Sequence, residues 1–139
     1  HGMPAEMNRI LEIAQRHDLS VIEDVAQAHG AQYHGRLCGS FGDAAAYSTQ
    51  ASKTLSSGCQ GGLFTTDDEL IHQRASLLQY FGEIVVPGQE RESQEYNAYG
   101  LGWMYRGDMF SQALIRNQLK RLDQNNMHRV ENCRFLPNI

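Results

Sequence analysis

A lysine stands in a serine- and glycine-rich stretch of this sequence, AYSTQASKTLSSGCQGG, which runs from residue 46 to residue 62. The chain holds two lysines against ten arginines, and Lys53 is one of the two. Unlike arginine, lysine can lose its proton and attack a carbonyl group. The neighbouring hydroxyls can donate hydrogen bonds, and the glycines let backbone N–H groups approach an anion. The stretch therefore predicts a phosphate cradle around a nucleophilic amine.

An acidic residue, Asp24, follows an earlier apolar run. In open α/β sheets, ligands bind beyond the carboxyl ends of the strands, so Asp24 and Lys53 could converge in the fold. An amine, a phosphate cradle and a carboxylate that keeps a pyridine nitrogen protonated are together what pyridoxal phosphate requires. The alternative is that Asp24 is a helix cap or a solvated strand end and that Lys53 is a surface charge.

Helices interleaved with short apolar strands are expected to position these residues. Apolar residues at intervals of three and four, and acidic residues at cap positions, predict helices over 4–17, over 69–81 and from Asp108 onwards, where the last could continue to Phe135. Apolar runs predict buried strands at 19–22 and 44–47 and a further strand at 63–66, and four glycines between 30 and 42 predict a small hairpin or irregular connection. Residues 82–102 read as a long ordered loop or short strands. The pattern predicts an α/β fold with a mainly parallel sheet flanked by helices.

Composition narrows the class of protein. At 139 residues, the length suits one domain, and a net charge of -4 with a pI near 5.8 argues against nucleic acid or an anionic membrane as a partner. No apolar run approaches the roughly 20 residues that span a bilayer. Three cysteines without paired spacing suit free thiols in a cytoplasmic protein. The first and last residues suggest a segment of a longer polypeptide.

The run VIEDVAQAHGAQYHGRLCGSFGDAAAYSTQASKTLSSGCQGGLFTTDDEL resembles the DegT/DnrJ/EryC1/StrS family of sugar aminotransferases. These are fold-type I enzymes that depend on pyridoxal phosphate. An acid-Asp-x-x-Gln block, then Ser-x4-Lys, then a Gly-Gly strand carry the resemblance, which extends over the whole chain. It implies that residues 1–139 are the central and C-terminal part of a cofactor-binding large domain, with its N-terminal part and a small C-terminal domain absent.

The resemblance also implies roles for individual residues. Lys53 would form a Schiff base with the cofactor and later shuttle a proton. Asp24 would bind the pyridine nitrogen, Gln27 would lie against the ring or its 3′-oxygen, and Ser48 would bind the phosphate. Glutamate or glutamine would donate the amino group to a ketone of a nucleotide-linked sugar or a cyclitol. A homodimer is expected, because the family builds its site from two subunits. A second hypothesis is a non-catalytic cofactor-binding relative or regulator.

Two positions depart from the family pattern. Gln60 stands where an acid commonly precedes the Gly-Gly pair, and Met104 stands where an asparagine or lysine reaches the neighbouring subunit's cofactor. Arg106 could compensate, although a structural role for it is an equal alternative.

Two further groups of residues have alternative interpretations. His29, His34 and Cys38 could be considered metal ligands, but their spacing matches no zinc pattern, and no metal site is expected. The aromatic residues Tyr96, Tyr99, Trp103 and Tyr105 could line a sugar pocket or pack together.

Overall fold

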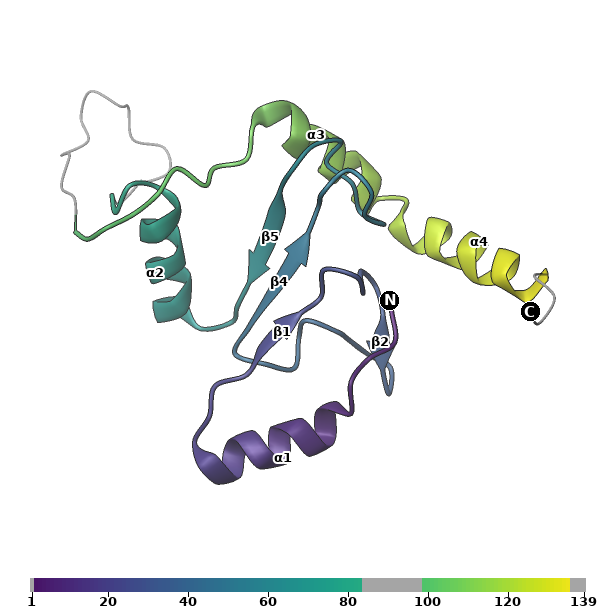
Figure 1. Cartoon of the computed structure of the whole chain (residues 1–139), viewed down its shortest axis with the longest axis horizontal. Coiled ribbons are helices and arrows are strands. Elements are labelled where there is room, and N and C mark those ends of the chain that lie inside the picture. Colours follow the sequence, from purple (N-terminus) through teal and green to yellow (C-terminus); the bar gives the residue numbers. More distant parts are fainter. Residues whose placement is uncertain (1, 84–98, 136–139) are drawn as a thin grey trace. The chain divides into compact units, whose positions relative to one another are not determined.

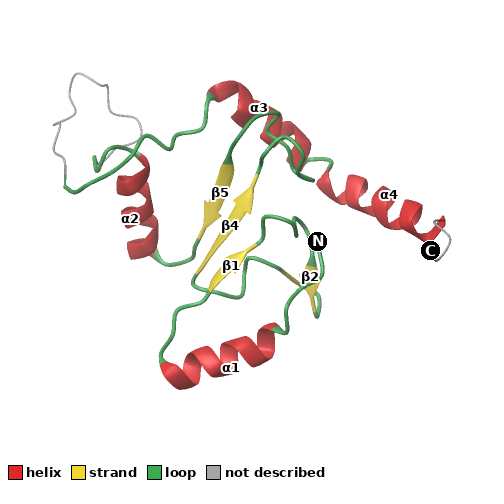
Figure 2. Cartoon of the chain, viewed as in Figure 1, coloured by secondary structure: helices red, strands yellow, loops and turns green. Residues whose placement is uncertain are grey.

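The computed structural model describes residues 2–83 and 99–135, which fall into two compact units. The first unit comprises His1–Thr65 and Asp108–Ile139, and the second comprises Thr66–Gly107. Helices and strands both occur in the first unit (Figure 2). The predicted α/β class is therefore confirmed.

A three-stranded sheet lies at the centre of the first unit, with β4 between β1 and β5 (Figure 1). These strands are β1 (Ile22–Asp24), β4 (Ala44–Ser48) and β5 (Gly62–Thr65). β1 and β4 are parallel, and Asp24 lies opposite Ala46. β4 and β5 are antiparallel. The sheet is thus mixed, and its parallel pair ends at two of the predicted site residues, Asp24 in β1 and Ser48 in β4.

The two faces of this sheet differ in burial. Side chains alternate between faces along a strand, so the register places Ile22, Asp24 and Ser48 on one face. Glu23 and Ala45 lie on the other face and are buried. The expectation of a strand buried on both faces is wrong for β1, because the Ile22 side chain is 74% exposed. Ala44 lies on the Ile22 face and is also buried, so within the described residues it is β1 whose Ile22 face is open.

Helix α1 (Met7–His17) precedes the sheet in the chain and confirms the first predicted helix. Met7 and Ala14 are its buried residues. The helix begins three residues after Pro4, and it ends where Asp18 adopts a left-handed conformation with φ 53°. The Leu19 N–H then donates to the Ala14 carbonyl at 2.9 Å, which closes the last turn.

A small hairpin connects β1 with β4, as the glycine spacing predicts. Its strands are β2 (Gln32–Tyr33) and β3 (Arg36–Leu37), which pair antiparallel. The two residues of the turn, His34 and Gly35, have φ values of 49° and 80°. Positive φ at both central positions is typical of the type I′ turn that suits a two-residue hairpin.

Glu23 anchors the loop that follows this hairpin. Its carboxylate accepts hydrogen bonds from the backbone N–H groups of Gly39 at 2.7 Å, Phe41 at 2.6 Å and Gly42 at 2.9 Å. The Glu23 side chain is buried, so these donors replace the water that the carboxylate loses on folding. The polar residue inside the sheet therefore holds a loop in place.

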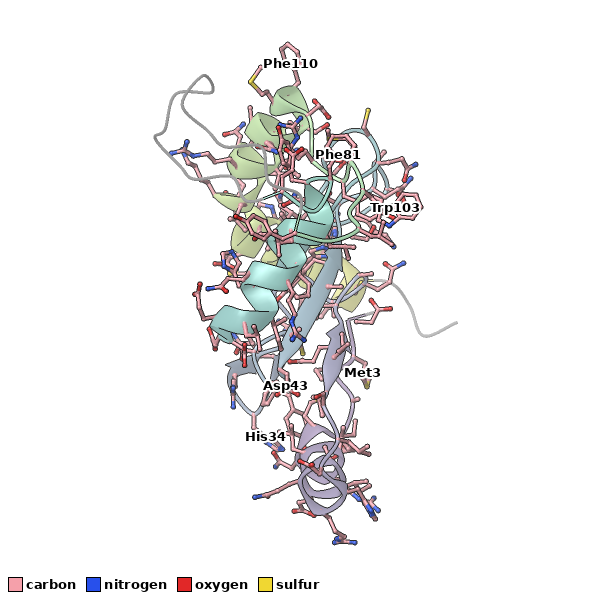
Figure 3. All side chains as sticks on the ribbon, turned by 90° about the vertical axis from the view of Figure 1, so that its left-hand side faces the viewer. Met3, His34, Asp43, Phe81, Trp103 and Phe110 are labelled. Atoms are coloured by element: carbon pink, nitrogen blue, oxygen red, sulfur yellow. The ribbon has the colours of Figure 1, made fainter. Side chains whose placement is uncertain are left out.

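The C-terminal helical region confirms its predicted start, but it consists of two helices. Asp108 caps α3 (Met109–Leu119) by accepting from the Ser111 N–H at 2.9 Å. Between the helices, the Arg121 N–H donates to the Gln118 carbonyl, three residues earlier, at 3.0 Å. This spacing marks a tighter turn before α4 (Leu122–Phe135). Phe110 projects away from the first turn of α3 (Figure 3) and is 84% exposed.

The second unit contains α2 (Glu69–Gln79), which confirms the predicted helix there. Asp68 caps it by accepting from the Ile71 N–H at 2.9 Å. Beyond the helix, the Trp103 N–H donates to the Leu78 carbonyl at 2.8 Å and the Tyr105 N–H donates to the Gln79 carbonyl at 3.0 Å. Most of the loop predicted at 82–102 lies outside the described residues.

Candidate active site

The carboxyl ends of β1 and β4 meet at one edge of the sheet, because the two strands are parallel. Asp24 is the last residue of β1, and Ser48 is the last residue of β4. Their side chains share one face of the sheet. The structure therefore brings a carboxylate and a hydroxyl to the edge from which the Lys53 loop leaves.

Asp24 is exposed and begins a turn. Its Oδ1 accepts from the Ala26 N–H at 3.0 Å, and the Ala28 N–H donates to the Val25 carbonyl at 3.0 Å. A carboxylate that bonds two residues onward is typical of an Asx turn, and the next element after Asp24 is the strand β2, so no helix begins at this turn. Gln27 lies exposed within this turn. The helix-cap interpretation of Asp24 is therefore wrong, while its carboxylate remains accessible at the strand end.

The Lys53 loop is stabilised by its own hydroxyl groups. Ser56 Oγ donates to the Ala51 carbonyl at 2.9 Å, and Ser57 Oγ donates to the Thr49 carbonyl at 2.6 Å. These two hydroxyls hold the loop together. Like Ser56 and Ser57, Ser48 accepts at its Oγ from a backbone N–H two residues onward, that of Gln50 at 3.4 Å. That bond leaves the Ser48 O–H proton available for another acceptor.

Lys53 is half-buried in this loop. Its backbone N–H donates to the Gln50 carbonyl at 2.9 Å. Its side-chain charge acts on His29, which comes from the turn after β1. An electrostatic interaction thus connects Lys53 with the turn that follows Asp24.

His29 is a buried residue that the sequence analysis considered only as a metal ligand. Its side chain is 6% exposed, and its ring centroid lies 5.9 Å from that of Tyr47. Within the described part of the chain, neither ring nitrogen has a hydrogen-bond partner. Burial lowers the pKa of His29, the Ser48 carbonyl partly opposes this, and the Lys53 charge lowers the pKa further. A neutral imidazole therefore lies beside the site at neutral pH.

This burial predicts a pH dependence of stability. The unfolded chain binds a proton at His29 with the ordinary histidine pKa of 6.5, whereas burial lowers this pKa in the folded chain, which binds the proton only at lower pH. Stability contributed by neutral His29 is therefore present above pH 6.5 and falls as the pH drops below that value. Urea unfolding at several pH values should show that His29→Asn loses less stability on acidification than the parent protein. An equal loss of stability in His29→Asn and the parent would contradict this account. So would a reduced loss in His72→Asn, a control variant at an exposed position.

A second buried polar group, Thr49, lies at the start of the Lys53 loop. Thr49 is fully buried, and its Oγ1 has no hydrogen-bond partner among residues 2–83 and 99–135. A Cβ at Gly61 would lie 2.7 Å from this oxygen. Any side chain at position 61 would therefore crowd the base of the loop, which explains why a glycine stands there.

The two departures from the family pattern, Gln60 and Met104, belong to different units of the chain. Gln60 is exposed just before β5. In the second unit, Arg106 Nε donates to Met104 Sδ at 3.3 Å, and the Arg106 guanidinium lies 4.3 Å from the centroid of the Tyr80 ring. These contacts favour the structural alternative for Arg106.

The remaining candidates do not form a ligand set. Trp103 and Tyr105 are exposed and stack with ring centroids 6.3 Å apart, while Tyr96 lies outside the described residues. His34 lies exposed at the hairpin turn, and burial raises the pKa of the half-buried Cys38 thiol. In the chain as far as the structure describes it, no three metal-ligating side chains lie together.

The carboxyl edge of the sheet therefore presents a lysine-bearing loop, a carboxylate and a hydroxyl, at the place where open α/β sheets bind their ligands. Residues 1–138 match the model of the DegT/DnrJ/EryC1/StrS aminotransferase family, and the chain belongs to this family. None of the described helices has both the length and the apolar character needed to cross a membrane.

Individual relatives support this membership. The L-glutamine:2-deoxy-scyllo-inosose aminotransferase of Micromonospora echinospora is 36% identical over 135 residues, which cover 95% of this chain and 32% of the relative. The dTDP-3-amino-3,4,6-trideoxy-alpha-D-glucose transaminase of Streptomyces venezuelae is 35% identical over 129 residues, or 93% and 32% of the two chains. The solved aminotransferase from Psychrobacter cryohalolentis has a TM-score of 0.79 and 35% identity, with 86% and 31% covered. This chain spans about a third of the length of these relatives.

Proposed function

We propose that this chain forms part of a pyridoxal-phosphate-dependent aminotransferase. The observation that carries the proposal is the half-buried Lys53, whose loop leaves the same sheet edge at which Asp24 and Ser48 stand on one face. Two observations support this proposal: the buried Thr49 hydroxyl has no hydrogen-bond partner among the described residues, and a Cβ at Gly61 would crowd it. These features fit a cofactor that carries an aldehyde, a phosphate and a basic ring.

Each residue has a role that follows from its chemistry. Bound pyridoxal phosphate supplies an aldehyde that carries amino groups and a ring that accepts electrons. Lys53 would hold the cofactor through its amine, and the same amine, when free, would be the base that takes a proton from the donor carbon bearing the amino group. Asp24 would keep the ring nitrogen protonated, Ser48 would donate its O–H to the phosphate, and Gln27 would contact the ring or its 3′-oxygen.

The substrates follow from the relatives' names. A glutamine:scyllo-inosose aminotransferase and a dTDP-sugar transaminase match this chain over more than nine-tenths of its length. They support glutamine or glutamate as the donor and a keto-cyclitol or nucleotide-linked keto-sugar as the acceptor, in amino-sugar biosynthesis. We further propose that the chain belongs to the large domain of a cytoplasmic homodimer, in which residues beyond these 139 complete the site.

Addition of an amino donor tests this proposal directly. The purified full-length protein, loaded with pyridoxal phosphate, should change its visible absorbance when glutamine or glutamate is added without an acceptor. The reason is that the amino group passes to the cofactor, and a keto acid should appear in equal amount. Cofactor binding with no absorbance change and no keto acid would instead identify a non-catalytic relative or regulator.

A further inference from the structure

A glutamine side chain holds the turn that carries Lys53. Gln50 is half-buried, two residues after the end of β4. Its side-chain Oε1 accepts two hydrogen bonds from Ser52, one from the backbone N–H at 2.8 Å and one from the hydroxyl at 2.6 Å. Its backbone carbonyl accepts from the Lys53 N–H at 2.9 Å. The amide of Gln50 therefore fixes the residue before the lysine, and its main chain binds the lysine itself.

Gln50 also bonds to Ser48, which precedes this turn at the end of β4. Its backbone N–H donates to Ser48 Oγ at 3.4 Å. Because the Ser48 oxygen accepts this bond, its O–H proton is directed towards a different acceptor. The proposed phosphate ligand and the proposed covalent ligand are thus both bonded to one residue between them.

These bonds contribute more to local order than to overall stability. Ser52 is exposed, so water can replace the Gln50 amide as a partner for both of its donors. The turn, however, belongs to no described helix or strand. Without the side-chain acceptor, residues 50–53 would therefore sample more backbone conformations, and that entropy would be lost again when the cofactor binds.

We propose that Gln50 is a positioning residue, which pre-orders the Ser48 hydroxyl and the Lys53 amine for an aldehyde-bearing phosphate cofactor. The inference rests on the proposed function and adds a residue that acts through its neighbours. It requires the side-chain carbonyl of Gln50, and it does not require the size of the side chain.

Two variants separate the carbonyl from the size. Gln50→Met keeps the length and removes the acceptor, whereas Gln50→Asn keeps a neutral carbonyl that can reach the N–H two residues onward. In titrations of the cofactor-free full-length protein with pyridoxal phosphate, Gln50→Met should raise the dissociation constant by about tenfold. Gln50→Asn should restore most of the affinity. Gln124→Ala, at an exposed position on α4, serves as the control and should bind as the parent does.

Amide hydrogen exchange in the cofactor-free protein supplies a readout that does not depend on activity. The Ser52 and Lys53 amides should exchange faster in Gln50→Met than in the parent and in Gln50→Asn, while the unfolding midpoint in urea stays nearly unchanged. Unaltered affinity in Gln50→Met, or affinity as low in Gln50→Asn as in Gln50→Met, overturns the role of Gln50 alone. A parent protein that binds no pyridoxal phosphate overturns the proposed function together with this inference.

Discussion

Replacement of Lys53 by alanine is expected to abolish transamination and the visible absorbance of the bound cofactor together. The amine is the group that bonds the cofactor and then moves the proton, so its loss removes both functions at once. Turnover should fall by a factor of at least about 10³, because general acid–base catalysis alone contributes that much. Steady-state rates with glutamine and a keto-sugar, measured beside the absorbance spectrum, check this result.

The chain supplies a matched control for this experiment. Lys120, the other lysine, is exposed at the end of α3, so Lys120→Ala should leave turnover and absorbance unchanged. Lys53→Arg should be as inactive as Lys53→Ala, because a guanidinium keeps the charge but does not lose its proton. Turnover retained in Lys53→Ala would refute the assignment of this residue and, with it, the proposed function.

Among the substitutions proposed here, replacement of Glu23 by alanine is expected to lower the free energy of unfolding most. The buried Glu23 carboxylate accepts from three backbone N–H groups in the loop before β4, and alanine would leave all three without that partner. Hydrogen bonds to a charged group contribute roughly 1.5–3 kcal/mol each, so a total loss of about 3 kcal/mol or more is expected. Urea unfolding followed by circular dichroism measures the change in the free energy of unfolding.

A conservative variant and a surface control sharpen this prediction. Glu23→Gln keeps one oxygen, which can still accept from Phe41 and Gly42, but it turns an amide donor towards the Gly39 N–H. It should therefore be intermediate in stability. Glu12→Ala, at an exposed position on α1, should change the free energy by less than about 0.5 kcal/mol. If Glu23→Ala matched Glu12→Ala, the carboxylate would not hold this loop.

Residues whose chemistry is unusual for their surroundings can be recognised in the sequence. Residues whose role depends on a contact with another residue of the chain cannot. Lys53 stands out because lysine is scarce in this chain, and Asp24 stands out at the end of an apolar run. Gln50 and His29 carry no such signal. One is a common polar residue in a loop, and the other is a histidine whose burial against Tyr47 depends on contacts between separate segments.

The sequence by itself determined the α/β class, the family and most of the helix and strand positions. Periodicity, cap residues such as Asp68 and Asp108, and the His34-Gly35 turn act over a few neighbouring residues, so they are visible in the order of the chain. Only the tertiary structure decided that Glu23 is buried and Ile22 exposed, since that depends on which face of β1 is covered. Burial is set by the pairing of strands and loops far apart in sequence, and one apolar run is compatible with either face.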